Sequence, residues 1–282
     1  MGRFDGVLLV SDICDTLIDT SDGAFVGGDT GELKPVSEQD RRALEYFTAE
    51  GGRFTVATGR GLKYILPYGD SIPINAPVVL GDGAAIYDIK SGAYLELAAL
   101  DERARELGQT LLDRSPTTSA TTRHLDGGFC AVRPDSDIRM LMKLDPEILE
   151  VSSLLEVPIP MQSLRFSDQH ETLKEIHDFL RTQDTDGAYE LMFTAEKRLQ
   201  MTARGYGKGN MVRRLAERLG VSMEHLYCAG NGEDDISMLK VAKQGFIPYN
   251  CSQEVQDCGA SEAGSAGQGL MKNIIASLEN RY

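Results

Sequence analysis

The sequence predicts a doubly wound α/β fold, in which a parallel sheet carries helices on both faces and a mixed α+β region is inserted into it. Short buried-strand patterns alternate with helical patterns at both ends of the chain, and each strand ends in a polar or glycine-rich junction. The middle of the chain has a different, hairpin-like pattern. With 282 residues, the chain is long enough for one large domain or two smaller ones.

Five short apolar runs are the expected core strands. They are Val7–Ile13, Arg53–Thr58, Pro77–Leu80, His225–Ala229 and Gly245–Pro248.

Helical patterns separate several of these strands. Ser37 is a good N-cap for a helix that would end at Gly51 and Gly52. Apolar residues at i, i+3, i+4 and i+7 predict a second helix over 209–219, which Gly220 would end. A third helix is expected over Glu233–Lys243. The repeated order of strand, helix and strand favours a parallel sheet.

The inserted α+β region is expected over residues 84–200, which leaves 1–83 and 201–282 for the core. Its ordered segments should be a hairpin, a helix after the N-cap Asp101, three strands and a second helix. The hairpin strands are Ala85–Tyr87 and Ala93–Leu97, the later strands are Gly128–Val132, Met161–Phe166 and Glu190–Phe193, and the second helix covers 170–181. Ser115–Thr122 is interpreted as a loop or an edge strand, and 20–31 as a flap rich in Gly, Asp and Thr.

Composition excludes several classes of partner. The formal net charge of −14 at pH 7 argues against a nucleic-acid backbone or an anionic membrane as partner. We expect neither a secretory leader nor a membrane span. Five scattered cysteines without a C-x-x-C pair fit buried thiols in a reducing cytoplasm better than disulfides or zinc. The expected partner is a small molecule, bound by a cytoplasmic monomer or homodimer.

The first candidate site residue is Asp12, at the end of the first strand, with Thr16 four positions later. Open parallel sheets place their chemistry just beyond the carboxyl ends of their strands. A carboxylate there can attack phosphorus and form an aspartyl-phosphate. An ordinary structural Asp at a strand end is the alternative.

Two further junctions suit phosphate binding. Thr58 and Gly59 end the second run, where a hydroxyl and the amides of a glycine turn can donate to phosphate oxygens. Lys208 opens the amphipathic helix, where its ammonium could neutralise the charge of a phosphoryl transition state. The ordinary alternatives are a helix N-cap and a solvated surface lysine. The surroundings of Lys208 do not match a Walker phosphate loop.

The fourth junction is acidic and follows the fourth strand. It reads Gly230-Asn231-Gly232-Glu233-Asp234-Asp235. Acidic residues beside a carboxylate nucleophile repel it unless a divalent cation lies between them, and Mg²⁺ prefers oxygen ligands and few protein groups. The alternative is a helix N-terminus whose carboxylates interact with the helix dipole. Each junction alone is weak, but their order along the chain is a stronger signal.

With these four junctions in order, the chain resembles the phosphatases of the haloacid dehalogenase superfamily, in the Cof-type branch. Asp12 matches the nucleophile motif, Thr58-Gly59-Arg60 the second, Lys208-Gly209 the third and Gly230–Leu239 the fourth. Gly81–Ala84 resembles the turn that leads into a cap domain, and Asn250 resembles the Asn that follows the fifth strand. The resemblance implies a Rossmann-like core with an α/β cap inserted after the third core strand.

The resemblance also implies roles for these residues. Asp12 would attack phosphorus, and Thr58, Gly59 and Lys208 would hold the phosphoryl oxygens. The metal, Mg²⁺, would be held by Asp12, the backbone carbonyl of Cys14, Asn231 and Asp235. Asp15, Asp234 and Asn250 are candidates for an additional acid or for supporting positions. The activity implied is Mg²⁺-dependent hydrolysis of a small phosphorylated metabolite, with a sugar phosphate as the expected substrate.

The chain departs from the family pattern D-x-D-x-T at its third position, which is Cys14, while an acid follows at Asp15. The missing carboxyl group would protonate the leaving alkoxide and activate water. A thiol, with an ordinary pKa of about 8.5, is poorly matched to this task. The fourth motif of the family reads G-D-x-x-N-D, and here Asn231 and Asp234 exchange its Asp and Asn, while Asp235 keeps the last position.

These departures leave several functions open. One is a slow or selective phosphatase, and another is a catalytically impaired protein that binds a phosphorylated ligand. A phosphotransferase or mutase would share the chemistry and differ in its acceptor. A receiver-like signalling domain is disfavoured, because a phosphoacceptor site needs no large insertion. Arg123, His124 and Arg133 lie in the insertion and could face a phosphorylated sugar or lie on the surface.

Overall fold

The computed structural model describes residues 2–20, 35–66, 72–126, 128–144 and 147–282. The core contains β1 (Leu8–Ser11), α1 (Glu38–Ala49), β2 (Arg53–Val56), α2 (Leu62–Ile65), β3 (Val78–Leu80), β4 (Ala85–Asp88), β5 (Ala93–Leu97), α6 (Lys208–Arg218), β12 (Leu226–Ala229), α7 (Ile236–Val241), β13 (Gln244–Pro248), α8 (Gln253–Gln256), β14 (Ser261–Gly264) and α9 (Leu270–Glu279). The cap contains α3 (Glu102–Arg114), β6 (Ser119–His124), β7 (Phe129–Val132), α4 (Ser136–Leu144), β8 (Ile148–Val151), β9 (Met161–Ser167), α5 (His170–Gln183), β10 (Tyr189–Ala195) and β11 (Arg198–Ala203).

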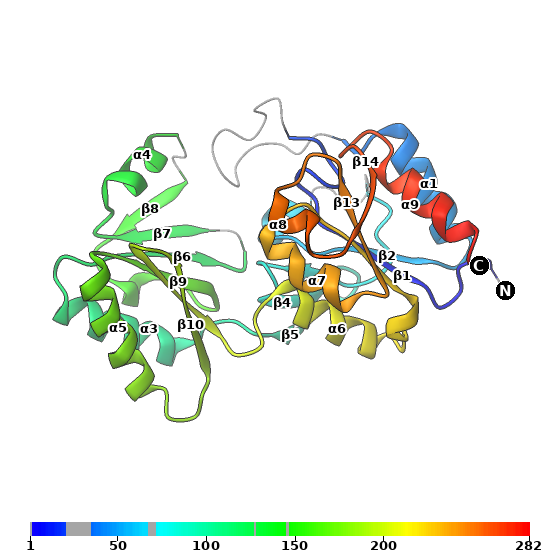
Figure 1. The fold of residues 1–282 in the computed structure, drawn as a ribbon. Helices are drawn as coiled ribbons and strands as arrows, with labels where there is room; N and C mark the ends of the chain where they lie inside the picture. The colour runs from blue at the N-terminus through cyan, green and yellow to red at the C-terminus, as the bar shows by residue number, and fades with distance from the viewer. Residues whose placement is uncertain (1, 21–34, 67–71, 127, 145–146) are drawn as a thin grey trace.

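The core sheet is parallel throughout, in the order β14-β13-β12-β1-β2. Alternation along β1 assigns its side chains to opposite faces. Leu9 packs in the cluster that includes Leu44 of α1 and Ile274 of α9. Leu8 and Val10 pack in a second cluster, which α6 and α7 contribute to. The result is the predicted three-layer α/β core, with α1 and α9 on one side and α6 and α7 on the other (Figure 1).

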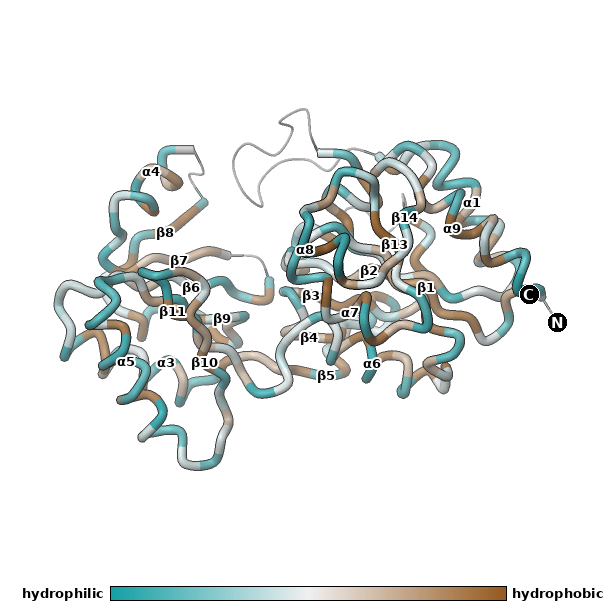
Figure 2. Tube along the Cα trace, viewed as in Figure 1, coloured by the Kyte–Doolittle hydropathy of each residue, from teal (hydrophilic) through white to brown (hydrophobic). Residues whose placement is uncertain are grey.

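The cap is a separate layer beside the core (Figure 1). Its sheet has the order β10-β11-β9-β6-β7-β8, and its own apolar cluster joins the sheet to α3 and α5. Figure 2 shows hydrophobic chain inside both bodies and hydrophilic chain along their outer loops. The predicted core with an inserted α+β cap is therefore confirmed.

The sheet pairing differs from the expected cap boundaries at both ends. The β4–β5 hairpin pairs with β3 and not with the cap sheet. The amide of Ala98 donates to the Ala84 carbonyl, whereas Leu100 pairs with Met161 of the cap. At the other end, β11 pairs with β9 and continues the cap sheet to Ala203. We infer that the chain crosses into the cap near residue 99 and returns near residue 205, and not at 84 and 200.

Two local predictions need correction. In the segment interpreted as a loop or edge strand, residues 115–118 are a loop, whereas 119–122 belong to β6, which pairs with β9 on one side and β7 on the other and is therefore an internal strand. Its Ser- and Thr-rich composition is compatible with an internal position because one face of the cap sheet is turned toward the core. The helix expected over Glu233–Lys243 begins as a 3₁₀ turn, Glu233–Asp235, followed by α7.

Three other expectations concern the whole chain. Almost all of the flap predicted over 20–31 lies outside the described residues, since only residue 20 is among them. All five cysteines are free. None of the helices in the described ranges combines the length and apolar character needed to cross a bilayer.

Candidate active site

Lys208 is the central cation of the candidate site. It is the first residue of α6, and its side chain is almost fully buried. Its Nζ lies 2.9 Å from Asp12 Oδ1, which follows β1. It also lies 2.6 Å from Asp234 Oδ2 and 2.6 Å from Asp235 Oδ1, both in the turn after β12. Three predicted site residues from distant parts of the sequence therefore meet Lys208 at the carboxyl edge of the sheet.

The charges in this cluster do not balance. Burial raises the pKa of Asp12 to about 7, an effect opposed by Lys208 and strengthened by Asp235. Burial would lower the pKa of Lys208, but the surrounding carboxylates outweigh it and raise that pKa well above its ordinary value. With three carboxylates around one ammonium, the fully ionised cluster carries two excess negative charges. Such a cluster attracts a divalent cation.

Glycines allow the turns to approach one another closely. Gly83 has φ +92°, and a Cβ on it would lie 2.1 Å from the backbone carbon of Gly207. The Gly207 amide also donates to the Gly83 carbonyl at 3.3 Å. A Cβ on Gly59 would lie 2.5 Å from Asp82 Oδ1. The turns after β2 and β3 and the start of α6 thus pack together only because these positions lack side chains.

The acidic turn after β12 is organised by its own carboxylate. Asp235 Oδ2 accepts hydrogen bonds from the amides of Asn231 and Gly232, at 2.9 and 3.0 Å, while Oδ1 faces Lys208. Asn231 Oδ1 accepts from the Thr16 hydroxyl at 2.9 Å, which joins this turn to the loop after β1. Both carboxylate oxygens of Asp235 therefore have partners, and Lys208 contacts Oδ1 of Asp12.

Cys14 is held by an arginine. The Nε and Nη2 atoms of Arg60 each lie 3.3 Å from its sulfur. Burial raises the pKa of the Cys14 thiol despite the opposing charge of Arg60. The nearby Asp15 has φ +56°, and its Oδ1 accepts from both the amide and the hydroxyl of Thr20. The shift of the acid by one residue thus gives Asp15 a local partner in its own loop.

A cavity of about 490 Å³ connects these groups. The sequence-predicted residues that line it are Asp12, Cys14, Asp15, Thr58, Gly59, Lys208, Asn231, Asp234 and Asp235. Thr58 is buried, and its hydroxyl oxygen accepts from the Arg60 amide at 3.2 Å. Asn250 is exposed after β13 and is not among the described residues that line this cavity.

The same cavity is lined by Asp82, Arg123 and Arg165. Burial raises the pKa of Asp82, whose Oδ2 accepts from Gln162 of the cap at 3.0 Å. No sequence motif points to Arg165, because its position over the cavity depends on the register of the cap strands. Of the other cap residues considered, Arg133 donates to the carbonyls of Ser115 and Leu112 within the cap.

His124 also stays within the cap, where its Nε2 lies 3.4 Å from the sulfur of Cys130. Of Arg123, His124 and Arg133, only Arg123 is among the described residues that line the cavity.

The oxygen groups at this edge of the sheet are suitable ligands for Mg²⁺, whereas a metal that needs several acidic or sulfur ligands would not find them among the residues that the structure describes. Within the described part of the chain, no three His, Cys, Asp or Glu side chains are grouped to hold a metal ion. Asp12, Asn231 and backbone carbonyls offer carboxylate, amide and peptide oxygens beside an excess of negative charge. Mg²⁺ takes few protein ligands and retains several waters, so this donor set is compatible with it.

Comparison with known proteins agrees with this geometry. A family model described as haloacid dehalogenase-like hydrolase matches residues 9–264. The YxeH protein of Bacillus subtilis is 25% identical over 86% of this chain and 92% of its own length. Pyridoxal phosphate phosphatase YbhA of Escherichia coli is 22% identical over 76% of this chain and 81% of its own length.

Solved structures share the whole fold. BT1666, a phosphatase from Bacteroides thetaiotaomicron, has a TM-score of 0.76 at 17% identity, covering 99% of this chain and 97% of that one. The subclass IIB sugar phosphatase BT4131 has a TM-score of 0.67 at 17% identity, with 98% of each chain covered. The family match, the cap inserted after the β3–β5 sheet and the acidic cluster around Lys208 together establish that this chain belongs to the haloacid dehalogenase-like hydrolases, as a phosphatase of the Cof-type branch.

Proposed function

We propose that the protein is a Mg²⁺-dependent phosphatase that hydrolyses a small phosphorylated metabolite through an aspartyl-phosphate. One observation carries the proposal: Asp12, Asp234 and Asp235 surround the buried Lys208 in a cavity that Thr58 also lines. Lys208 contacts one oxygen of Asp12, which leaves the other to attack phosphorus.

The steps follow from these positions. An Asp12 oxygen forms a bond to phosphorus while the bond from phosphorus to the leaving oxygen breaks, and the leaving group departs as an alkoxide or phenolate that takes a proton from water. The Thr58 hydroxyl, the Gly59 amide and Lys208 would donate to the phosphoryl oxygens as negative charge develops on them. Water then attacks phosphorus, and the bond to Asp12 breaks to release phosphate and restore the carboxylate.

The metal would be held by Asp12, the Cys14 carbonyl and Asn231, with Asp235 orienting the amides of the acidic turn. When bound, Mg²⁺ would neutralise the excess charge of the carboxylates and of the phosphoryl group. Asp234 contributes charge beside Lys208, and its side chain is half exposed.

The second candidate is a catalytically impaired protein that binds a phosphorylated ligand. Cys14 favours it, because a buried thiol held by Arg60 replaces the carboxyl group that the family uses as an acid. The carboxylate of Asp15 already accepts two hydrogen bonds from Thr20, so Asp15 is poorly placed to substitute for the missing acid. Such a protein would be stabilised by a phosphorylated ligand without releasing phosphate.

A phosphatase screen tests the proposal. Wild-type protein and Asp12→Asn are assayed with Mg²⁺ on an aryl phosphate and a panel of sugar phosphates, each also with added sugar acceptors. The proposal predicts phosphate release by the wild type that needs Mg²⁺ and disappears in Asp12→Asn. Activity that survives the substitution would contradict the mechanism, and label transfer to an acceptor would indicate a phosphotransferase.

A further inference from the structure

The cap sheet has two chemically different faces. Ala120 of β6 pairs with Phe166 of β9, which also pairs with Leu199 of β11, and these side chains belong to the apolar cluster under α3 and α5. Side chains alternate along a strand, so the intervening positions face the other way. On that second face, Arg165 is opposite Thr121 and Gln200.

Arg123 shares this second face with Arg165. Arg123 and Thr121 are two residues apart on β6, and Arg165 is opposite Thr121 on β9. Such diagonal neighbours have Cβ atoms about 7–8 Å apart, within reach of long side chains. Burial, followed by the positive charge of Arg123, lowers the pKa of Arg165, which fits two guanidinium groups close together. The cap therefore presents a pair of arginines to the cavity over Asp12.

Both guanidinium groups are held in position by cap neighbours. The Nε of Arg165 donates to Gln200 Oε1 at 3.1 Å. The guanidinium of Arg123 lies 5.3 Å from the ring centroid of Phe129, within cation–π range. Asp82 is the acidic residue whose pKa both arginines lower, but burial outweighs them and keeps that pKa raised.

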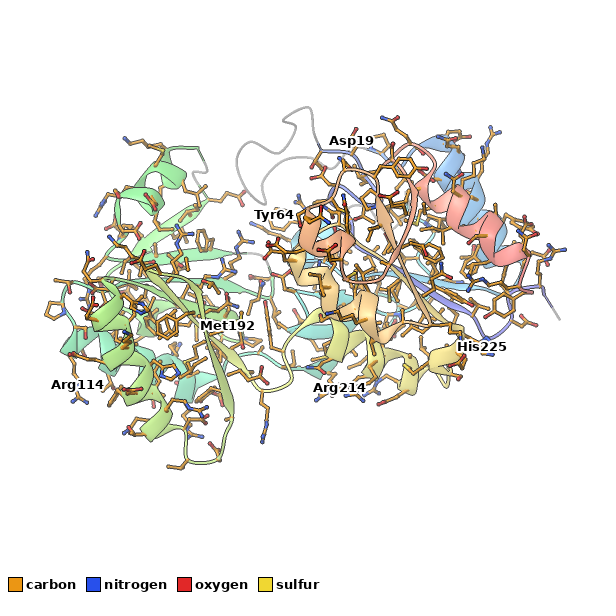
Figure 3. All side chains as sticks on the ribbon, in the orientation of Figure 1. Asp19, Tyr64, Arg114, Met192, Arg214 and His225 are labelled. Atoms are coloured by element: carbon orange, nitrogen blue, oxygen red, sulfur yellow. The ribbon has the colours of Figure 1, made fainter. Side chains whose placement is uncertain are left out.

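The arginine pair lies where the leaving group of a bound substrate would be. The pair lines the same cavity as Asp12, Thr58 and Lys208. A second cavity of about 830 Å³ continues from it, since Asp82, Arg165, Lys208 and Asp234 line both. Met192, labelled in Figure 3 on the side of the cap that faces the core, lines this continuation with Tyr206. A substrate with its phosphoryl group at Asp12 would extend beneath the arginines.

We propose that Arg123 and Arg165 bind a second anionic group on the substrate, a carboxylate or another phosphate. Paired guanidinium groups recognise such groups through several parallel charge-assisted hydrogen bonds, whereas a neutral sugar offers only hydroxyls. The substrate class is then a phosphorylated sugar acid or a sugar bisphosphate. This inference rests on the proposed phosphatase function and deepens it.

Matched substrate pairs test the inference. Each pair differs in one anionic group: 6-phosphogluconate against glucitol 6-phosphate, 3-phosphoglycerate against glycerol 3-phosphate, and fructose 1,6-bisphosphate against fructose 6-phosphate. We expect kcat/KM to be at least about tenfold higher for an anionic member in one or more pairs, since a charge-assisted hydrogen bond contributes that much. Equal turnover of both members in every pair would overturn the inference.

Cap variants locate the effect. Arg123→Gln and Arg165→Gln should each raise KM for the anionic substrate about tenfold, and Arg165→Lys should retain part of the preference. Turnover of p-nitrophenyl phosphate, which lacks a second anion, should fall by a smaller factor than turnover of the anionic substrate. The matched control is Arg103→Gln, because Arg103 is an exposed cap arginine on α3 that pairs with Asp186 and is not among the residues lining this cavity. Equal losses for neutral and anionic substrates would refute a role in recognition.

Failure of the two proposals can be told apart. Hydrolysis of p-nitrophenyl phosphate that depends on Mg²⁺ and on Asp12 reports the phosphatase function, whatever the leaving-group preference. If turnover is absent, calorimetric titration of the wild type with both members of each pair still tests the arginine site. Tighter binding of an anionic member that is lost in Arg165→Gln supports the site, and equal binding of both members in all pairs overturns it.

Discussion

Replacing Cys14 by aspartate should restore an acid at the position where the family pattern has one. In the structure, two nitrogen atoms of Arg60 lie 3.3 Å from the Cys14 sulfur. A carboxylate at this place would accept the same donors as charge-assisted hydrogen bonds of about 2.7–2.9 Å. Arg60 would thus orient the new side chain, and the surrounding backbone would not have to move.

The expected gain depends on the leaving group. General acid–base assistance contributes about 10²–10⁴-fold. Arg60 would lower the pKa of the new carboxyl group and so reduce the fraction that is protonated and able to donate, which places the expected gain for alkyl phosphates near 10²-fold, or about 2.7 kcal/mol of activation free energy. An aryl phosphate releases a stable phenolate that needs little protonation, so its turnover should change by less than about tenfold.

The assay compares kcat/KM of the wild type and Cys14→Asp on one alkyl and one aryl phosphate with saturating Mg²⁺. Cys14→Ser is the matched control, because it removes the thiol without adding a carboxyl group. Asp15→Asn tests whether the neighbouring acid already serves as donor. The reasoning is refuted if Cys14→Asp leaves the alkyl-to-aryl ratio unchanged, or if the wild type hydrolyses both esters equally well and Asp15→Asn has no effect.

Three further predictions concern the folded state. Lys208→Met should abolish activity and lower the free energy of unfolding by about 3–5 kcal/mol in EDTA, since it leaves buried carboxylates without their cation. The control Lys243→Met, at an exposed ion pair, should lower it by less than about 1 kcal/mol. Equal losses of the two variants in urea unfolding would contradict this. The pKa of Asp12 rises from 3.8 to about 7 on folding, so the folded state binds more protons and the stability of the metal-free protein should fall as pH rises across this interval. In urea unfolding at a series of pH values, Asp12→Asn should flatten the dependence of stability on pH. An unchanged dependence would contradict the raised pKa of Asp12. Gly83→Ala should lower the melting temperature more than Gly92→Ala. Both glycines have positive φ, but the nearest atom to an added Cβ lies at 2.1 Å for Gly83 and at 3.8 Å for Gly92. Equal shifts would mean that the contact of Gly83 with Gly207 is unimportant.

The core was predictable because its signals are local. The N-cap Ser37, the start of α6 near Lys208 and the junctions after β1, β2 and β12 all follow from short patterns that the structure retains. A parallel sheet then brings the ends of these strands to one edge, so the meeting of Asp12, Lys208 and Asp235 follows from strand order.

The cap was less predictable because its strands depend on distant partners. The Thr-rich β6 lacks a clear alternation of apolar and polar residues, since its polar face lies toward the cavity, and β8 and β11 were not anticipated. The diagonal placement of Arg165 beside Arg123 depends on the register of β6 and β9, which the sequence does not specify. The partner of Asp15 likewise depends on a positive φ that no local motif announces.

The most direct measurement uses beryllium trifluoride, which mimics a phosphoryl group on a carboxylate and does not depend on turnover. Thermal unfolding is followed with and without this anion, in Mg²⁺ or EDTA, for the wild type and Asp12→Asn. If Asp12 and the acidic turn share one divalent cation, the anion should raise the melting temperature of the wild type by several degrees only when Mg²⁺ is present, and should not affect Asp12→Asn. Equal stabilisation of both proteins, or stabilisation of the wild type in EDTA, would contradict the account.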